Sequence, residues 1–509
     1  MNILGISAGF HDAAVSIINH EGDIVFAAHS ERYSKKKNDA HLCPELLAEV
    51  DQYDISKIAY YERPWLKQLR RWRSGEKIQW NRLTVEQCLH SEMGNYSPPV
   101  GVPNLSDDLM WTLNPRPLVY SYTHHESHAA AGFQTSPFDR ATVVVIDAIG
   151  EFDTISIWAA EYDNTGRARY KKLWGQKYPH SIGLFYSAIT KHVGLKPLDE
   201  EYIMMGMAAY GQKGFADHMK SLLVEDEWNM IFKDNLHVGV AESFMSTIND
   251  MDTAASAQYL AENLIYNVMR RAKNFGWSKN LVYMGGVALN CSANRNLGDY
   301  FDNIWIMPNP GDAGSSLGCA ALAFGKRINW TNAFLGHEIP GPYPCNDILD
   351  ALVTSRIVGV ASGRAEFGPR ALGNRSLLAD PRGPDIKDAV NEIKRRQKFR
   401  PFAPVILEEM AEEYFIMHPG WKKSPYMQSV AVCKHPKEYP AIVHADGTSR
   451  VQTVPKDGSG IRELLEKWYV MTGCPMLLNT SLNIRGEPMV NDRADANRFE
   501  KLYNVKVCS

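Results

Sequence analysis

A three-strand pattern that occurs twice constrains the fold of this chain more than any other feature. Three short apolar segments, rich in β-branched residues and joined by short connections that contain glycine, open the chain. A similar set of three begins again at Ala141. We therefore predict two related halves, each opening with an antiparallel β-meander. The predicted strands are Asn2–Ser7, Ala13–Asn19 and Asp23–His29, then Ala141–Ile146, Thr154–Glu161 and Arg167–Trp174.

In both halves the first strand leads into a turn that contains glycine and aspartate. The turns are Gly9–Asp12 in the first half and Asp147–Asp153 in the second. Turns of this kind leave backbone amides free to face a phosphate. This duplicated α/β organisation is that of the actin-like, sugar-kinase-like ATPase fold, in which the nucleotide lies between the halves. Two unrelated meanders that look alike by chance are the alternative.

Two later strands are also expected to end in glycine-bearing turns. Helical spacing of apolar residues over Ala255–Phe275 predicts a helix that leads into a strand at Leu281–Met284. The two glycines of Met284–Asn290 allow a ligand to approach the backbone, although tight packing also explains them. A further strand, Ile304–Met307, runs into Pro308–Gly318, whose small residues start another helix.

Length and composition limit the classes of protein to consider. At 509 residues the chain is too long for one ordinary core, and we place a domain boundary in the Pro/Gly-rich segment Gly336–Cys345. The net charge of -3 gives no overall basic field, which argues against a nucleic-acid partner but leaves a local basic patch open. The amino terminus lacks the basic region of a signal peptide, and no apolar run is long enough to span a membrane. Because the eight scattered cysteines include no CxxC pair, we expect a cytoplasmic protein.

Two histidines and two aspartates form a candidate metal site. His124 and His128 are spaced i and i+4, which on a helix points both imidazoles from one face toward a single ion. Asp147 follows a strongly apolar strand, and Asp312 lies in a glycine-flanked turn after another. Such a mixed N/O set suits a divalent ion such as Fe(II), Mn(II) or Zn(II). Spacing alone does not identify the ion, and an HxxxH pair without the aspartates would carry little weight.

Beyond the predicted boundary, four stretches combine cationic side chains with tightly turning backbone. Several converging cations are needed to hold a dianion against its desolvation cost, so together these stretches predict an anion pocket. For any single arginine, a salt bridge to a nearby acidic residue is the simpler explanation. The stretches are Gly363–Ser376, Lys394–Pro404, Gly447–Val454 and Asn479–Pro488.

The stretch Trp65–Trp80 interleaves tryptophans with basic residues. Such a pattern can stack on nucleobases. An amphipathic surface helix with its aromatic side chains tucked in is the other explanation, and we favour it.

With these motifs the chain resembles the carbamoyltransferase family that includes the nodulation-factor, cephamycin and tobramycin O-carbamoyltransferases. The resemblance extends nearly from end to end, and Glu366–Ser376 and Phe399–Pro404 are highly specific for it. It also rests on Gly5–Ser16, Ser30–Asp39, His124–Gly132, Met204–Gly211, Gly285–Cys291 and the four cationic stretches above.

The resemblance implies an actin-like amino-terminal domain, residues 1–336, similar to the tRNA threonylcarbamoyl-transferase, and a YrdC-like carboxy-terminal domain, residues 345–509. In such enzymes the YrdC-like domain forms carbamoyl-adenylate from carbamoyl phosphate and ATP. The other domain then transfers the carbamoyl group to a hydroxyl of the acceptor. The implied cofactors are a divalent metal, with Fe(II) the expected ion, and ATP with Mg. A small molecule or a nucleotide is expected as acceptor, and a homodimer is left open.

The resemblance also implies roles for individual residues. The metal ligands would be His124, His128, Asp147 and Asp312. The nucleotide would contact Gly150, Gly285, Gly286 and Asn290. Carbamoyl phosphate would be held by Arg370, Lys394, Arg400, Arg450 and Ser481. His11 and Lys37 would be catalytic, on the acceptor side, with the His11 imidazole able to accept the proton of the acceptor hydroxyl.

Three departures from the family pattern bear on these assignments. Ile203 stands where a lysine is common, so one cation expected near the nucleotide is absent. Arg396–Lys398 replaces the usual Arg-Glu-Pro, with Gln397 at its centre, and adds positive charge to the carbamoyl phosphate region. Ser509 follows Asn479–Asn483 sooner than in many relatives, so we expect a missing or remodelled acceptor pocket.

Other functions are compatible with parts of the pattern. An actin-like ATPase or small-molecule kinase would transfer the γ-phosphoryl group directly, but it needs neither the HxxxH pair nor the cationic second domain. A binding protein that keeps the fold is a further alternative, although all four candidate metal ligands are present. A tRNA-modifying enzyme would share the chemistry but requires a basic RNA-binding face.

Overall fold

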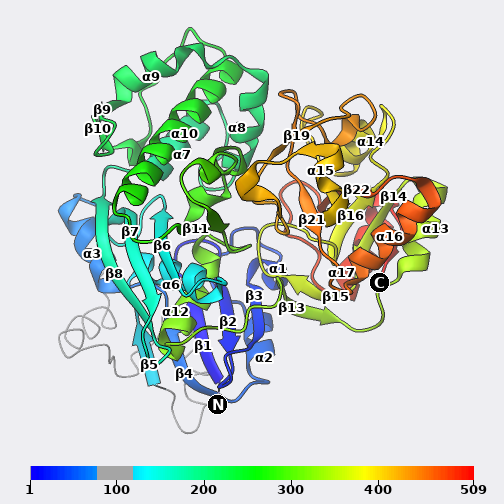
Figure 1. Ribbon diagram of the computed structural model, residues 1–509, viewed down its shortest axis with the longest axis horizontal. Coiled ribbons are helices and arrows are strands. Elements are labelled where there is room, and N and C mark those ends of the chain that lie inside the picture. The colour runs from blue at the N-terminus through cyan, green and yellow to red at the C-terminus, as the bar shows by residue number, and fades with distance from the viewer. Residues whose placement is uncertain (1, 77–117) are drawn as a thin grey trace. The chain divides into compact units, whose positions relative to one another are not determined.

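The computed structural model describes residues 2–76 and 118–509, and the chain divides into two compact units (Figure 1). The first unit comprises Met1–Ser34, Asn38–Leu289 and Asp299–Thr331. The second comprises Lys35–Lys37, Asn290–Gly298 and Asn332–Ser509. Two short segments that interrupt the first unit in the sequence, Lys35–Lys37 and Asn290–Gly298, therefore belong to the second unit.

The first unit contains two five-stranded sheets with the same topology. Their strand orders are β3-β2-β1-β4-β5 and β8-β7-β6-β11-β12. In each sheet the first three strands form an antiparallel meander, and the last two run parallel to the first. The predicted duplication is therefore confirmed. The strands are β1 (Asn2–Ser7), β2 (Ala14–Ile18), β3 (Ile24–His29), β4 (Ile55–Tyr60), β5 (Leu118–Ser121), β6 (Arg140–Ile146), β7 (Asp153–Tyr162), β8 (Ala168–Lys177), β11 (Asn280–Met284) and β12 (Asn303–Trp305).

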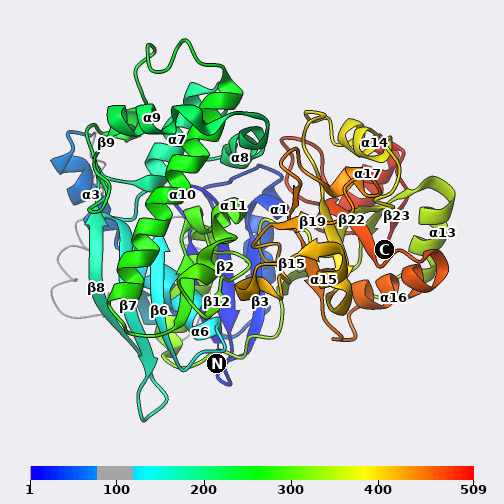
Figure 2. The same cartoon turned by 45° about the horizontal axis from the view of Figure 1, so that its top comes forward.

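Two helices built largely from small residues lie between the sheets, as Figures 1 and 2 show. Helix α6 (His124–Thr135) packs on β6 and β11, and α12 (Ser315–Phe324) packs on β1, β2 and β4. The two helices also pack on each other at very short range. A Cβ atom added to Gly318 would lie 1.8 Å from the carbonyl oxygen of Ser127, so only glycine fits there. The backbones of α6 and α12 are therefore in direct contact.

The remaining elements of the first unit complete the two halves. Helix α10 starts before the predicted Ala255 because the Asn249 side chain accepts a hydrogen bond from the Asp252 N–H and caps the first turn. The elements are α1 (Glu31–Ser34), α2 (Pro44–Val50), α3 (Pro64–Arg73), α7 (Ile182–His192), α8 (Glu201–Met207), α9 (Ala216–Leu223), α10 (Asp250–Asn274), β9 (Val224–Asp226) and β10 (Ile231–Phe232). The stretch Trp65–Trp80 forms α3 in part, and its residues 77–80 lie outside the described residues.

The second unit is built on a six-stranded mixed sheet of order β21-β17-β22-β16-β14-β23. Its strands are β14 (Ile357–Ala361), β16 (Arg375–Ala379), β17 (Ala403–Leu407), β21 (Gln452–Val454), β22 (Met476–Ser481) and β23 (Val507–Cys508). Helices α13 (Cys345–Ser355) and α16 (Gly460–Thr472) pack on this sheet and on each other. The unit also contains α11 (Cys291–Asn294), α14 (Ile386–Ile393), α15 (Ala411–Tyr414), α17 (Arg493–Tyr503), β18 (Phe415–Ile416), β19 (Ala431–Cys433) and β20 (Thr448–Ser449).

We place the domain boundary in Gly336–Cys345 because its prolines and glycines disfavour both helix and strand, but that expectation is wrong over the first half of the segment. Strand β13 (Phe334–Ile339) extends into it and pairs with β15 (Gly363–Glu366). The prolines that disfavour a strand all follow Ile339, so they end the strand instead of preventing it.

Two features of composition have structural counterparts. The seven cysteines within the described residues are all free and buried. No helix in the described part of the chain combines the length and the apolarity that crossing a membrane requires.

The contact between α6 and α12 yields a first prediction. Gly318→Ala places a methyl group against the Ser127 carbonyl oxygen, and backbone must move to accommodate it. We expect the free energy of unfolding to fall by about 3 kcal/mol, measured by urea denaturation. Gly214→Ala is the control, because an added Cβ there meets no atom within 4 Å, and it should change stability by less than about 0.5 kcal/mol. Equal stabilities for the two variants would contradict the close packing of the helices.

Candidate functional site

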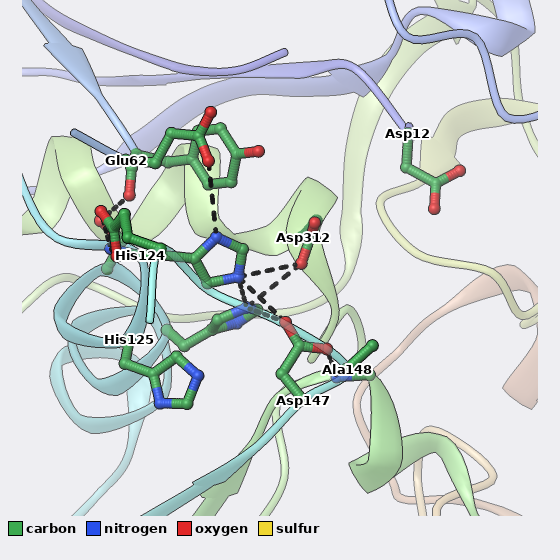
Figure 3. Close-up of polar contacts among 12 residues, drawn as sticks. Asp12, Glu62, His124, His125, Asp147, Ala148 and Asp312 are labelled. Carbon is green, nitrogen blue, oxygen red and sulfur yellow. Dashed lines mark hydrogen bonds and ion pairs between the residues drawn. The ribbon is translucent and has the colours of Figure 1, made fainter. Parts of the chain in front are cut away.

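Two imidazoles and two carboxylates converge in the centre of the first unit (Figure 3). The Nε2 atoms of His124 and His128 lie 3.1 Å apart. His124 Nε2 lies 3.0 Å from an oxygen of Asp147 and 3.3 Å from one of Asp312. His128 Nε2 lies 3.6 Å and 3.3 Å from the same two oxygens. All four side chains are buried. The fold therefore brings together, in its interior, the four residues predicted as metal ligands.

Local structure explains this convergence. His124 and His128 occupy successive turns of α6, so both rings leave the same face of the helix. Asp147 directly follows β6, and Asp312 precedes α12 by one short turn. Because α6 packs on β6 and on α12, the ends of these elements meet at one point.

The charges of the four groups are strongly coupled. Burial lowers the pKa of the His124 imidazole, but the carboxylates of Asp312 and Asp147 outweigh burial and hold it well above its usual value. Burial raises the pKa of the Asp147 carboxyl, but hydrogen bonds from His124 and His128 reverse this and hold it well below its usual value. Cationic charge at this point is therefore strongly favoured.

This set of groups fits a divalent cation. Their candidate ligand atoms all lie within 4.8 Å of one another, and atoms that share an ion at about 2.1 Å are separated by about 3 to 4.2 Å. Two ionised carboxylates with two neutral imidazoles carry two negative charges, which a divalent ion neutralises. The second ring nitrogens, Nδ1 of His124 and of His128, are buried without a hydrogen-bond partner among the described residues. They remain available for contacts that orient the rings.

Two further buried carboxylates beside His124 were not predicted from the sequence. Glu151 accepts hydrogen bonds from the backbone N–H groups of His124 and Arg63. Glu62 lies beside the His124 ring, with its Oε2 4.0 Å from His124 Nδ1. The Lys67 ammonium binds the Glu62 carboxylate at 3.0 Å. The sequence does contain a signal for Glu62, because an acidic residue soon after the apolar strand Ile55–Tyr60 repeats the pattern of Asp147 after β6.

The predicted acceptor-side histidine lies beside this cluster. His11 Nε2 is 3.8 Å from Asp312, and its Nδ1 is 3.0 Å from the carboxylate of Asp12. Burial lowers the pKa of the His11 imidazole, but the hydrogen bond with Asp12 and the charge of Asp312 raise it to about 9. The ring therefore binds a proton more tightly than a free imidazole. Lys37 belongs to the second unit.

Three of the four predicted nucleotide-contacting residues lie close to the histidine and aspartate cluster. The Gly286 N–H donates to Asp147 Oδ1 at 3.2 Å. Gly285 has φ +93°, and a Cβ there would lie 2.2 Å from the Ile146 carbonyl oxygen, so glycine is required. Gly150 donates its N–H to the Asp153 carbonyl. Asn290 instead belongs to the second unit, where its side chain caps α11.

The absence of a lysine at position 203 also has a local explanation. Ile203 is buried in α8 at 1% exposure. An apolar side chain suits that environment, whereas a lysine there would need a buried partner.

In the second unit, the predicted carbamoyl phosphate residues gather at one end of the six-stranded sheet. Strand β22 runs antiparallel to both β16 and β17, and β21 runs parallel to β17. The starts of β16, β17 and β21 therefore lie at the same end as the finish of β22. Arg370 precedes β16, Lys394 and Arg400 precede β17, Arg450 precedes β21, and Ser481 ends β22.

Contacts at this end join the cationic loops to one another. The Lys394 ammonium is buried and donates to Ser481 and to both oxygens of Asn483 at 2.9 Å. Asn479 donates to the carbonyl of Ala371, which anchors the loop that carries Arg370. Lys394 thus holds the Ser481 loop in place.

Arg375, one of the arginines behind the predicted anion pocket, has a structural role instead. Its guanidinium is fully buried and donates to five backbone carbonyl oxygens, those of Ser362, Gly363, His337, Asn374 and Asn491. With its donors used in this way, Arg375 joins separate loops. Sequence reasoning missed this because the partners are backbone atoms of remote segments.

Comparison with known proteins shows similarity over both units. A family model described as "Carbamoyltransferase N-terminus" matches residues 107–321, and one described as "Carbamoyltransferase C-terminus" matches residues 349–508. An uncharacterized protein of Synechocystis sp. is 30% identical, over 98% of this chain and 94% of the relative. Nodulation protein NolNO of Sinorhizobium fredii is 29% identical, over 96% of this chain and 76% of the relative. Nodulation protein NolO of Bradyrhizobium diazoefficiens is 32% identical, over 73% and 75%.

A buried histidine that supports the Asp312 loop gives a pH-dependent prediction. His29 Nε2 accepts a hydrogen bond from Asn309 at 3.0 Å, which requires a neutral ring. Burial and the nearby Arg32 lower the pKa of His29 to about 4, despite the opposing charge of Asp12. Between about pH 6.5 and 4 the unfolded chain therefore binds more protons, so this contribution is complete above pH 6.5 and is lost on acidification. We expect a loss on the order of 3 kcal/mol over this range.

His29→Gln should remove that part of the acid sensitivity, measured by urea unfolding at pH 7 and pH 4.5. His20→Gln, at an exposed position, is the control and should keep the wild-type pH dependence. The explanation is wrong if His29→Gln loses as much stability on acidification as the wild type does.

The four-residue cluster predicts that His128→Ala greatly weakens binding of a divalent ion. Removing one of four ligands should lower the affinity by at least about 100-fold, measured by chelator competition. His125→Asn is the matched control from the same helix turn, because His125 Nδ1 bonds Ser156 Oγ and its ring lies away from the cluster (Figure 3). Equal metal affinity in the two variants would contradict the assignment.

Proposed function

This chain belongs to the carbamoyltransferase family, and from that premise we propose that it activates carbamoyl phosphate with ATP and transfers the carbamoyl group to a hydroxyl of its acceptor. The observation that carries the proposal is the buried cluster of two histidines and two aspartates inside the region that matches the amino-terminal family model. The alternative function, an actin-like ATPase or small-molecule kinase, transfers the γ-phosphoryl group directly and does not need such a cluster.

Activation is proposed for the second unit, which we take to be YrdC-like. In the balanced overall reaction, carbamoyl phosphate, ATP and one water give carbamoyl-adenylate, phosphate and pyrophosphate. Arg370, Arg400 and Arg450 are proposed to bind the phosphate of carbamoyl phosphate, with the Ser481 hydroxyl as a further donor. The common end of the sheet on which their segments lie supports this assignment. Lys394 contributes by holding the Ser481 loop.

Transfer is proposed for the first unit. Here His124, His128, Asp147 and Asp312 would hold a divalent ion, for which Fe(II) is our candidate. When bound, such an ion supplies electrostatic stabilisation for charge that develops on the phosphate and the carbamoyl oxygen. Gly150, Gly285 and Gly286 would line the adenylate, because they lie close to the histidine and aspartate cluster and carry no side chain.

His11 is proposed to take the proton of the acceptor hydroxyl at Nε2. Asp12 lies beside Nδ1, so a neutral ring that carries its proton on Nδ1 and donates it to Asp12 leaves Nε2 free to accept the proton of the hydroxyl. The catalytic role of Lys37 and the nucleotide contact of Asn290 remain predictions from the family resemblance, and both residues belong to the second unit. The acceptor is proposed to be a small molecule or a nucleotide with a free hydroxyl.

A test separates activation from transfer. Purified protein is incubated with Mg-ATP and carbamoyl phosphate, and pyrophosphate is measured; a panel of hydroxylated acceptors is then screened by mass spectrometry for a carbamoyl increment. Arg450→Met should lower pyrophosphate formation by about 100-fold, because it removes a donor to the reacting phosphate. His128→Ala should lose carbamoyl transfer.

Arg169→Met is the matched control, because Arg169 is exposed in the first unit and pairs with Asp163, and it should retain both activities. If ADP forms in place of pyrophosphate, the proposed activation chemistry is wrong and a kinase or ATPase reaction is indicated.

A further inference from the structure

A buried ion pair lies directly behind one of the candidate metal ligands. Glu62 is 4% exposed, and both of its carboxylate oxygens contact the Lys67 ammonium, at 3.0 Å and 3.3 Å. Its Oε2 lies 4.0 Å from Nδ1 of His124, on the side of the ring opposite the cluster (Figure 3). Burying an ion pair costs desolvation free energy. The place of this pair beside a candidate metal ligand therefore calls for an explanation.

The two nitrogens of His124 face different environments. Nε2 faces Asp147 and Asp312, whereas Nδ1 is buried without a hydrogen-bond partner among the described residues. The ring also packs against the ring of Tyr61, with centroids 5.1 Å apart. Among the described residues, Glu62 Oε2 is the acidic oxygen that lies within ion-pair distance of Nδ1. A shift of about 1 Å would convert this contact into a hydrogen bond.

We propose that Glu62 is a positioning residue that accepts the Nδ1–H of His124 and so fixes the tautomer that leaves Nε2 free to bind a cation. Histidine ligands generally donate their other ring nitrogen to a carboxylate or a carbonyl, which orients the ring and makes it a better ligand. Lys67 holds the carboxylate in place. This inference rests on the metal site of the proposed function and assigns a role to a residue outside the four ligands.

Glu151 does not have the same role, although it is also buried beside His124. Its oxygens accept from the backbone N–H groups of His124 and Arg63, at 2.8 to 3.1 Å. Glu151 therefore fixes the first turn of α6. Of the two buried glutamates next to His124, Glu62 thus faces the ring and Glu151 faces the backbone.

The ion pair also connects the metal ligand with the acceptor side. The Lys67 ammonium lies over the ring of Phe10, 5.0 Å from its centroid. Phe10 in turn packs against His11, with ring centroids 4.6 Å apart, and is 43% exposed. A continuous series of contacts inside the first unit therefore leads from Phe10 through Lys67 and Glu62 to His124.

The test measures binding of Co(II) alone, by chelator competition and by its visible absorption, which reports ligand geometry. Glu62→Gln should weaken Co(II) binding by about 10- to 100-fold and change the absorption spectrum. Glu62→Asp should restore part of the affinity. Glu151→Gln is the matched control and should change Co(II) affinity by less than about threefold while lowering thermal stability.

Because Glu62→Gln leaves the Lys67 charge buried, the pair Glu62→Met and Lys67→Met is also made in one protein. It should weaken Co(II) binding as much as Glu62→Gln, since Lys67 acts through Glu62. Unchanged Co(II) affinity and spectrum in Glu62→Gln or in the double variant would overturn the role of Glu62, as would an equal loss in Glu151→Gln. Failure of the wild type itself to bind Co(II) would instead contradict the metal site of the proposed function.

Discussion

Direct backbone contact between α6 and α12 is the constraint on which the first unit depends. Each helix covers one of the two related sheets, and both sheets are brought together only if the helices approach without side chains between them. Gly318 satisfies this requirement on α12, while alanines and serines satisfy it elsewhere along both helices. The same contact places the start of α6 beside the start of α12, so the geometry of the candidate site follows from core packing.

The charges at that point are the second constraint. A carboxylate buried without a partner is strongly destabilising, yet five acidic side chains lie in or around the centre: Asp147, Asp312, Glu62, Glu151 and Asp12. Each of them has a defined partner. Lys67 binds Glu62, backbone N–H groups bind Glu151, His11 binds Asp12, and the two remaining aspartates share the imidazoles of α6. The concentration of negative charge is consistent with a site for a cation and is difficult to explain as fold stabilisation alone.

The second unit uses its cations in two different ways. Arg375 and Lys394 are buried and bind mainly backbone oxygens, so they hold loops in position. Arg370, Arg400 and Arg450 lie in segments that precede β16, β17 and β21, at one end of the sheet. In the sequence these residues look alike, because a cation beside a turn has the same local pattern whether its partner is a carbonyl or a ligand. Burial and the backbone partners of Arg375 and Lys394 are properties of the folded chain, so local sequence does not reveal them.

The sequence by itself determined the duplicated meanders, the helix that carries His124 and His128, and the strand ends that carry Asp147 and Asp312. These features follow from periodicity and from turn residues, which are local properties. Tertiary structure alone decided that Glu62 faces His124, that Arg375 joins remote loops, that β13 extends into the Pro/Gly-rich segment, and that Asn290 and Lys37 belong to the second unit. Each of these depends on atoms contributed by distant segments, and no local pattern specifies which segments meet when a core packs.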